Sequence, residues 1–88
     1  MQTDPQDERR GHRERLRAKF LGPGIDALHE YEVLELLLTY AVPRRDVKPL
    51  AKTLLREFGS LKAVLDAEPS ELIKVRGVGN AAAVLIRL

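Results

Sequence analysis

The feature that most constrains the fold is a pair of glycines that flank a valine near the end of the chain. These residues lie in Glu71–Leu88, where ELIKVRGVGNAAAVLIRL joins two apolar stretches through Gly77, Val78 and Gly79. Glycine adopts positive φ without a Cβ clash, so the backbone can reverse here within about four residues. The spacing predicts a helix-hairpin-helix in which the Val78 side chain points inward and anchors the turn.

The predicted turn presents mainly backbone atoms to solvent. The first N–H groups of a helix have no acceptor within the helix, and the helix dipole favours an anion at that end. A phosphate is the anion that we expect there. We therefore predict that DNA phosphates are bound by the N–H groups of Gly77, Val78, Gly79 and Asn80.

The same pattern recurs weakly earlier in the chain. Placing Glu71–Gly79 over Glu35–Pro43 aligns an acidic start, an apolar helix end, a small residue, a valine and a helix breaker. This is the plan of a tandem helix-hairpin-helix, in which two hairpins hold phosphates on opposite strands, although unrelated helix pairs would often align as well. The first hairpin is degenerate, because it lacks the glycines and Pro43 has no N–H.

Basic side chains accompany both predicted turns. Around the first turn a phosphate contact would have to use side chains, and around the second turn basic residues stand on the entry side. Otherwise Arg44 and Arg45 are ordinary loop charges, one of them paired with Asp46. The basic residues that we predict to support phosphate binding are Lys74, Arg76, Arg44, Arg45 and Lys48.

The chain divides into a tail, an arm and a domain. Residues 1–8 are polar with nothing to bury, and we expect them to be disordered. Residues 9–24 are strongly basic and predict a short helix pinned by Leu16 and Phe20, followed by a glycine-proline-glycine turn. This helix is either a phosphate-contacting arm or a solvated face. Residues 25–88 form the predicted helix-hairpin-helix domain.

Within that domain the pattern is helical throughout. A helix that begins at Asp26 or His29 and runs to Tyr40 carries a wide apolar stripe. No segment alternates apolar and polar residues, so we predict no strands and an all-α domain of five or six helices. Further helices are expected after Asp46, over Leu61–Leu65 and from Pro69. The glutamates expected on the solvated face of the first of these helices are Glu30, Glu32 and Glu35.

The sequence also resembles the N-terminal domain of the RadC family, bacterial proteins named for DNA repair. The resemblance covers roughly residues 25–88 and is carried by ELLLTYAVPRRDVKPLAK, FGSL and VRGVGNAAA, in that order. The family implies a following JAB/MPN-type domain with metal-ligand histidines and an aspartate, to which no residue of this chain corresponds. Strong hairpins of this type often place proline and lysine after the second glycine. Here Asn80 and Ala81 stand instead, which lowers the expected affinity for DNA.

Two functions follow from these patterns. The first is sequence-independent DNA binding, for which the net charge of +2 is only mild support. The second is an interaction module that docks on the implied C-terminal domain or on another protein. Because the final helix is rich in alanine, this alternative predicts an exposed apolar patch over residues 81–88.

We expect neither catalysis nor a cofactor in this chain. Acid–base chemistry needs carboxylates or histidines placed in a pocket, and no nucleophile here has a base at hand. There is no cysteine, and His29 has no second ligand at metal-binding spacing. No apolar run is long enough for a membrane span or a signal peptide, so we expect a cytoplasmic protein.

Overall fold

The computed structural model describes residues 5–42 and 45–88, and it is helical over these ranges, with no strand among them. The all-α prediction is therefore confirmed. None of the helices in these ranges combines the length and the apolar character needed to cross a membrane. The elements are α1 (Pro5–Leu21), the 3₁₀ helix η1 (Ile25–Ala27), α2 (Glu30–Thr39), α3 (Lys48–Phe58), α4 (Leu61–Asp66), α5 (Pro69–Leu72) and α6 (Asn80–Arg87).

Local signals explain where the later helices begin and end. Gly59 adopts φ of 96° and ends α3, as glycine commonly does after a helix. The Ser60 hydroxyl accepts a hydrogen bond of 3.1 Å from the N–H of Ala63 and so caps α4. Pro69 occupies the first turn of α5, where its missing N–H costs nothing. The helices expected over Leu61–Leu65 and from Pro69 are confirmed, and α4 extends to Asp66.

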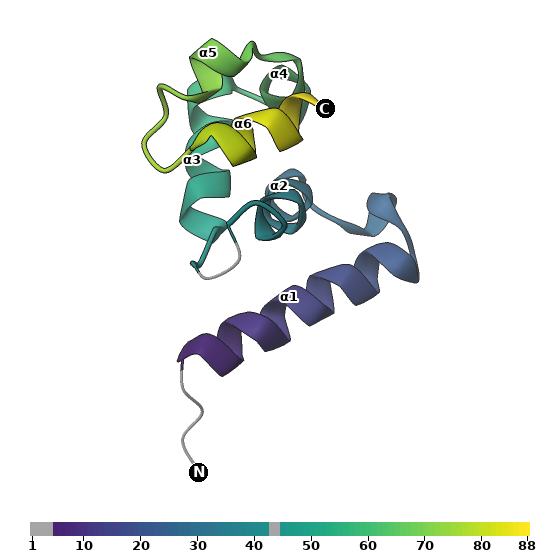
Figure 1. The fold of residues 1–88 in the computed structure, drawn as a ribbon. Coiled ribbons are helices and arrows are strands. Elements are labelled where there is room, and N and C mark those ends of the chain that lie inside the picture. The colour runs from purple at the N-terminus through teal and green to yellow at the C-terminus, as the bar shows by residue number, and fades with distance from the viewer. Residues whose placement is uncertain (1–4, 43–44) are drawn as a thin grey trace.

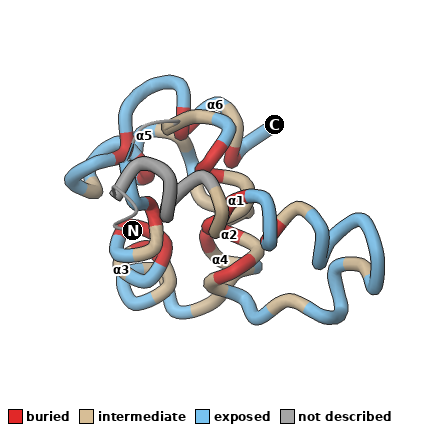
Figure 2. The backbone as a smooth tube through the Cα atoms, turned by 90° about the horizontal axis from the view of Figure 1, so that it is seen from below, coloured by how far each residue is buried: buried red, intermediate tan, exposed pale blue. Residues whose placement is uncertain are grey.

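Helix α2 is the centre of the fold. In Figure 1, α3 to α6 gather on one side of α2, and α1 runs along its other side. Figure 2 shows the buried positions in red, whereas long stretches of the outer loops are exposed. The core is made by apolar side chains from several helices, which include Leu34, Leu38, Leu54, Val64, Leu72 and Ile86.

Helix α1 is part of this fold, and it begins earlier than expected. It starts at Pro5, so residues 5–8 of the expected tail belong to the helix, whereas residues 1–4 lie outside the described residues. Proline is favoured at the first position of a helix, and acidic residues suit its N-terminal end. Leu16 is buried as predicted, but Phe20 remains 45% exposed and does not pin the helix.

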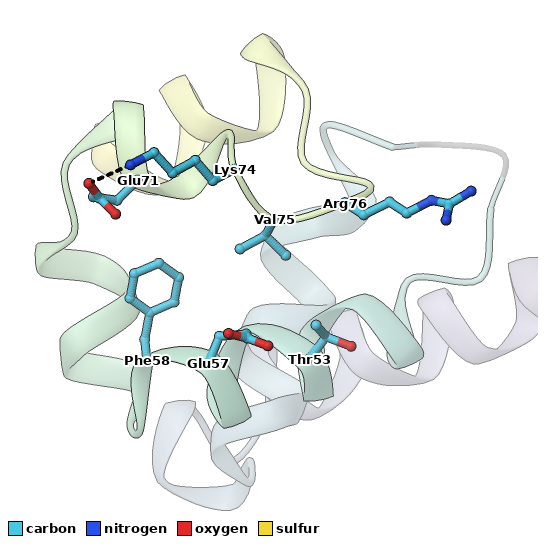
Figure 3. Close-up of a pocket in the computed structure, with 7 residues that line it drawn as sticks. All are labelled: Thr53, Glu57, Phe58, Glu71, Lys74, Val75 and Arg76. Carbon is cyan, nitrogen blue, oxygen red and sulfur yellow. Dashed lines mark hydrogen bonds and ion pairs between the residues drawn. The ribbon is translucent and has the colours of Figure 1, made fainter.

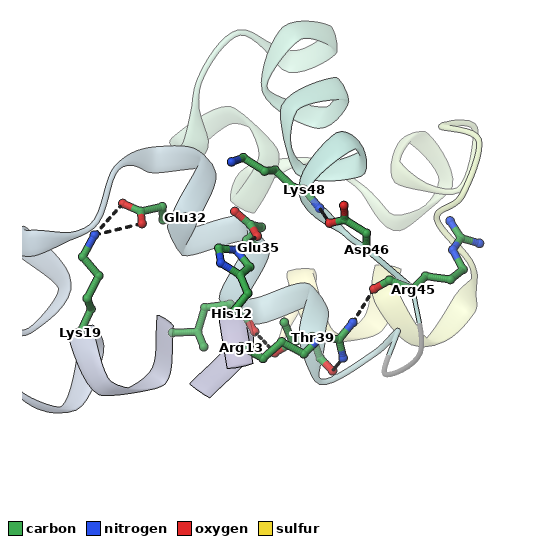
Figure 4. A network of polar contacts seen from close by, with 10 residues as sticks. His12, Arg13, Lys19, Glu32, Glu35, Thr39, Arg45, Asp46 and Lys48 are labelled. Carbon is green, nitrogen blue, oxygen red and sulfur yellow. Dashed lines mark hydrogen bonds and ion pairs between the residues drawn. The ribbon is translucent and has the colours of Figure 1, made fainter. Parts of the chain in front are cut away.

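Two of the three glutamates predicted to face solvent are buried between α1 and α2. The Glu35 residue is only 1% exposed, and its Oε2 lies 2.6 Å from Nε2 of His12. Glu32 is also buried, and its Oε2 lies 3.0 Å from Nζ of Lys19 (Figure 4). The prediction was wrong because α1 covers this face, and the basic helix supplies partners that make buried carboxylates tolerable.

Candidate nucleic-acid interface

The second turn, residues 73–79, reverses the chain between α5 and α6. Gly77 adopts φ of 101°, so it is the residue that requires glycine. Gly79 has φ of −94° in the extended region, so the positive φ at this turn belongs to Gly77 and not to Gly79. Val78 is buried, as predicted, and anchors the turn in the core. Its N–H donates to the carbonyl oxygen of Val75 at 3.0 Å, and so it already has a partner within the turn.

The start of α6 has open backbone donors. Gly79 is the residue before the helix, and it has no side chain with which to cap it. The ladder of α6 begins with the N–H of Ala83, which donates to the carbonyl oxygen of Gly79 at 3.0 Å. Over the described ranges, the N–H groups of Gly79 and Asn80 have no acceptor. Both residues are exposed, so these donors can reach an anion from solvent.

Arg45 brings a positive charge to the second turn from the first turn, of which residues 40–42 and 45–47 are described. A Cβ added at Gly77 would lie 3.3 Å from Nη2 of Arg45, so the guanidinium lies against this glycine. Figure 4 shows the Arg45 side chain extending toward the second turn. No carboxylate in the described part of the chain pairs with Arg45. The neighbouring Asp46 accepts from the N–H of Lys48 at 3.1 Å instead.

The other predicted basic residues are less closely grouped. Arg76 is exposed, and Figure 3 shows its side chain pointing away from the residues around it. Lys74 forms an exposed ion pair of 3.2 Å with Glu71. The ammonium of Lys48 lies over the ring of Tyr31, 5.5 Å from its centroid. Arg44 lies outside the described residues.

A hollow of about 650 Å³ lies between the end of α3 and the second turn (Figure 3). Two carboxylates and two cations share its lining, so its charges largely offset one another. It therefore offers no concentrated charge for a ligand. The lining residues are Thr53, Glu57, Phe58, Glu71, Lys74, Val75 and Arg76.

An apolar groove of about 520 Å³ runs along the outer face of α6. Val84 is 62% exposed and Leu88 97% exposed, which is unusual for large apolar residues that lie together. The patch predicted over residues 81–88 is thus present. The groove is lined by Tyr40, Ala41, Asn80, Ala81, Val84, Leu85 and Leu88.

Arg13 is the residue of this region that the sequence did not single out. Its guanidinium donates to the carbonyl oxygens of Thr39 at 3.3 Å and Val42 at 2.8 Å, and also to that of Arg45 (Figure 4). Arg13 is buried, although it lies in a run of mostly exposed basic residues. The one signal in the sequence is its position three residues before Leu16, which places both on the same helix face.

Comparison with known proteins gives one family. Residues 9–84 match the family model described as UPF0758 N-terminal. A UPF0758 protein of Fusobacterium nucleatum is 48% identical over 81 residues, which are 92% of this chain and 35% of the relative. One of Ruegeria pomeroyi is 51% identical over 72 residues, which are 82% of this chain and 32% of the relative. The chain thus spans about a third of the length of these relatives. No solved structure is significantly similar to it.

Proposed function

The chain belongs to the UPF0758 N-terminal family, which is the N-terminal region of the RadC family. From this premise we propose that the chain is a DNA-binding module that does not read base sequence. The observation that carries the proposal is the guanidinium of Arg45 against Gly77, beside the open start of α6. Backbone donors and an arginine side chain together form a site with the chemistry that a phosphate requires.

A phosphate at this site would accept from the N–H groups of Gly79 and Asn80, with Arg45 supplying charge alongside. Hydrogen bonds that involve a charged partner are about twice as strong as neutral ones. Contacts to phosphate fix the position of a protein on DNA but carry no base information. The expected binding is therefore independent of sequence and sensitive to salt.

The test is a fluorescence-anisotropy titration of labelled duplex and single-stranded DNA at low salt. Arg45→Gln should weaken binding about tenfold, because a hydrogen bond to a charged group contributes about 1.5–3 kcal/mol and tenfold is about 1.4 kcal/mol. Arg56→Gln is the matched control, since Arg56 is an exposed arginine of α3 that belongs to neither turn. Absence of binding by the unaltered chain to either DNA would reject the proposal.

Gly79→Leu tests the backbone donors separately. A Cβ at Gly79 meets no atom within 4 Å, so the larger side chain fits the fold but projects where the phosphate would lie. Binding should be lost while the far-UV circular dichroism spectrum stays helical. If the variant binds as the unaltered chain does, the start of α6 is not the contact.

A second candidate function is docking, and the apolar groove on α6 favours it. The groove has seven lining residues, whereas a stable interface between free proteins uses about 20–30 residues a side. Such a small patch suits a tethered partner, because a short linker provides an effective concentration of about millimolar. The partner that we propose is an apolar surface of the polypeptide that lies outside the matched region in the longer relatives.

A cysteine probe tests this docking, because the chain contains no cysteine. The Val84→Cys variant should react with a maleimide readily when alone and about threefold or more slowly when the rest of the Ruegeria pomeroyi relative is fused after it, since burial blocks access to the thiol. Lys62→Cys, on the exposed side of α4, is the control and should react equally in both forms. Equal rates for Val84→Cys in both forms would argue against docking.

A further inference from the structure

We infer that Arg13 is a positioning residue: it holds the proposed phosphate site in place and does not itself contact the phosphate. The inference rests on the proposed function and adds to it the way in which the site is assembled. The observation behind it is a set of three carbonyl oxygens around the first turn. Those of Thr39, Val42 and Arg45 all accept hydrogen bonds from the Arg13 guanidinium.

These three carbonyls need a donor of this shape. Thr39 is the last residue of α2, so its carbonyl oxygen belongs to the last turn of the helix, where acceptors lack partners and the dipole favours a cation. The other two oxygens lie farther along the turn, where no helix ladder satisfies them. The planar guanidinium presents five N–H donors in a fixed geometry and can serve all three acceptors at once. A lysine ammonium has no such spread.

The same contacts fix where Arg45 lies. Its carbonyl oxygen accepts from Arg13, while its guanidinium lies against Gly77. One residue is thus held at its backbone by α1 and meets the second turn with its side chain. Helix α1 is itself held to α2 by the contacts His12–Glu35 and Lys19–Glu32. His12 and Lys19 belong to α1, the helix that also carries Arg13. The arm therefore acts as a brace for the first turn.

This brace is distinguishable from a phosphate-contacting arm. Arg13 is only 9% exposed and donates to carbonyls within the protein, so it has no free surface for DNA. If α1 bound phosphates directly, the exposed arginines would matter most, and Arg15 is such a residue on the same helix. The brace predicts the opposite order, with the buried arginine more important than the exposed one.

The experiment compares Arg13→Gln, Arg13→Lys and Arg15→Gln in the DNA titration described above, with the full chain. Arg13→Gln and Arg15→Gln remove the same charge, so their long-range electrostatic effects are matched. Arg13→Gln should raise Kd about fivefold or more, Arg13→Lys should raise it less, and Arg15→Gln should change it less than about twofold. In NMR spectra without DNA, the Gly77 amide should shift in Arg13→Gln and not in Arg15→Gln.

A double-mutant cycle with Arg45→Gln shows whether Arg13 acts through Arg45. Arg13→Lys retains the charge and most of the packing, which guards against a variant that fails to fold. If Arg13 acts through Arg45, then Arg13→Lys should not weaken DNA binding further in a chain that already carries Arg45→Gln. Additive effects, or equal binding by Arg13→Gln and Arg15→Gln, would overturn the positioning role alone. No binding by the unaltered chain would overturn the proposed function and this inference with it.

Discussion

Gly77 is the residue at which the requirements of the fold and of the proposed site coincide. Its φ of 101° is open to glycine and costly for other residues, and the space where a Cβ would lie is bounded by Arg45 and Leu50 at 3.3 Å each. Conformation and packing therefore both disfavour a side chain at this position. Gly79 satisfies neither condition, because its φ is −94° and its surroundings are open.

The two glycines give a matched pair of substitutions. Gly77→Ala should lower the free energy of unfolding by about 1–2 kcal/mol, the usual cost of a left-handed conformation for a residue with a Cβ. Gly79→Ala should change it less, because its φ of −94° suits alanine and the lower entropy of the unfolded chain offsets the preference for glycine before a helix. Urea denaturation followed by circular dichroism measures both. Equal losses would contradict the assignment of the strained position to Gly77 alone.

At the scale of the elements, the contact between α1 and α2 carries buried charge. Glu32 accepts from the N–H of His29 at 3.0 Å and from Lys19, and the backbone donor is the main cause that lowers the pKa of this carboxyl below its ordinary value of 4.5. A carboxyl with a lowered pKa in the folded state stabilises the fold at higher pH. That stabilisation is present above the ordinary value and is lost as the pH falls through the lowered one.

Removal of this carboxylate should therefore make the free energy of unfolding depend less strongly on pH in the acidic range. Glu32→Gln should be less stable than the unaltered chain at pH 7, and the difference between the two should shrink below the ordinary value of 4.5. Urea titrations at neutral and acidic pH measure this. Glu14→Gln, which removes an exposed carboxylate of α1, is the control. A gap between Glu32→Gln and the unaltered chain that stays constant with pH would show that the ionised form is not what stabilises the contact.

Elements α3 to α6 could be predicted from the sequence because their signals are local. A capping serine, a glycine stop and a helix-opening proline act within a few residues of where they stand. The face of α2 could not be predicted in this way. Glu35 meets His12 across 23 positions of sequence, so the pattern within α2 alone suggested solvent where α1 lies.

In the proposed site, too, the features set by local sequence could be predicted, and those set by packing between distant segments could not. The turn at Gly77 and the buried Val78 follow from glycine geometry and from apolar spacing. The approach of Arg45 to Gly77 depends on how the two turns pack. The contact of Arg13 with the carbonyl oxygen of Arg45 depends on the docking of α1, which the sequence suggested was a separate arm. Lys48, which also follows the first turn, lies over Tyr31 instead. Sequence proximity to a turn did not decide which cation reaches it.

At the scale of the whole molecule, charge is nearly balanced, with 15 basic and 13 acidic residues. In the described part of the chain, Lys19, Lys62 and Lys74 form ion pairs with carboxylates. The proposed contact uses only one cation, Arg45, beside the backbone donors at the start of α6. The proposed site is thus a local contact to phosphate and not a broad basic surface.

The salt dependence of binding should reflect this balance. On duplex DNA the slope of log K against log salt is about −0.9 for each phosphate neutralised, so a site that neutralises one phosphate with Arg45 gives a slope of about −1. Anisotropy titrations over a series of salt concentrations measure it. A slope several times steeper would reveal a larger basic face, such as one that includes the exposed Arg15 of α1.

The double attachment of Arg45 has a thermodynamic consequence. Because α1 holds its carbonyl and the second turn meets its guanidinium, the docking of α1 and the occupation of the α6 start are linked equilibria. Linkage is reciprocal, so whatever binds at the start of α6 also stabilises α1 in its docked position by the same free energy. The N-terminal helix would then report, through slower hydrogen exchange or proteolysis, on an anion bound at the other end of the chain.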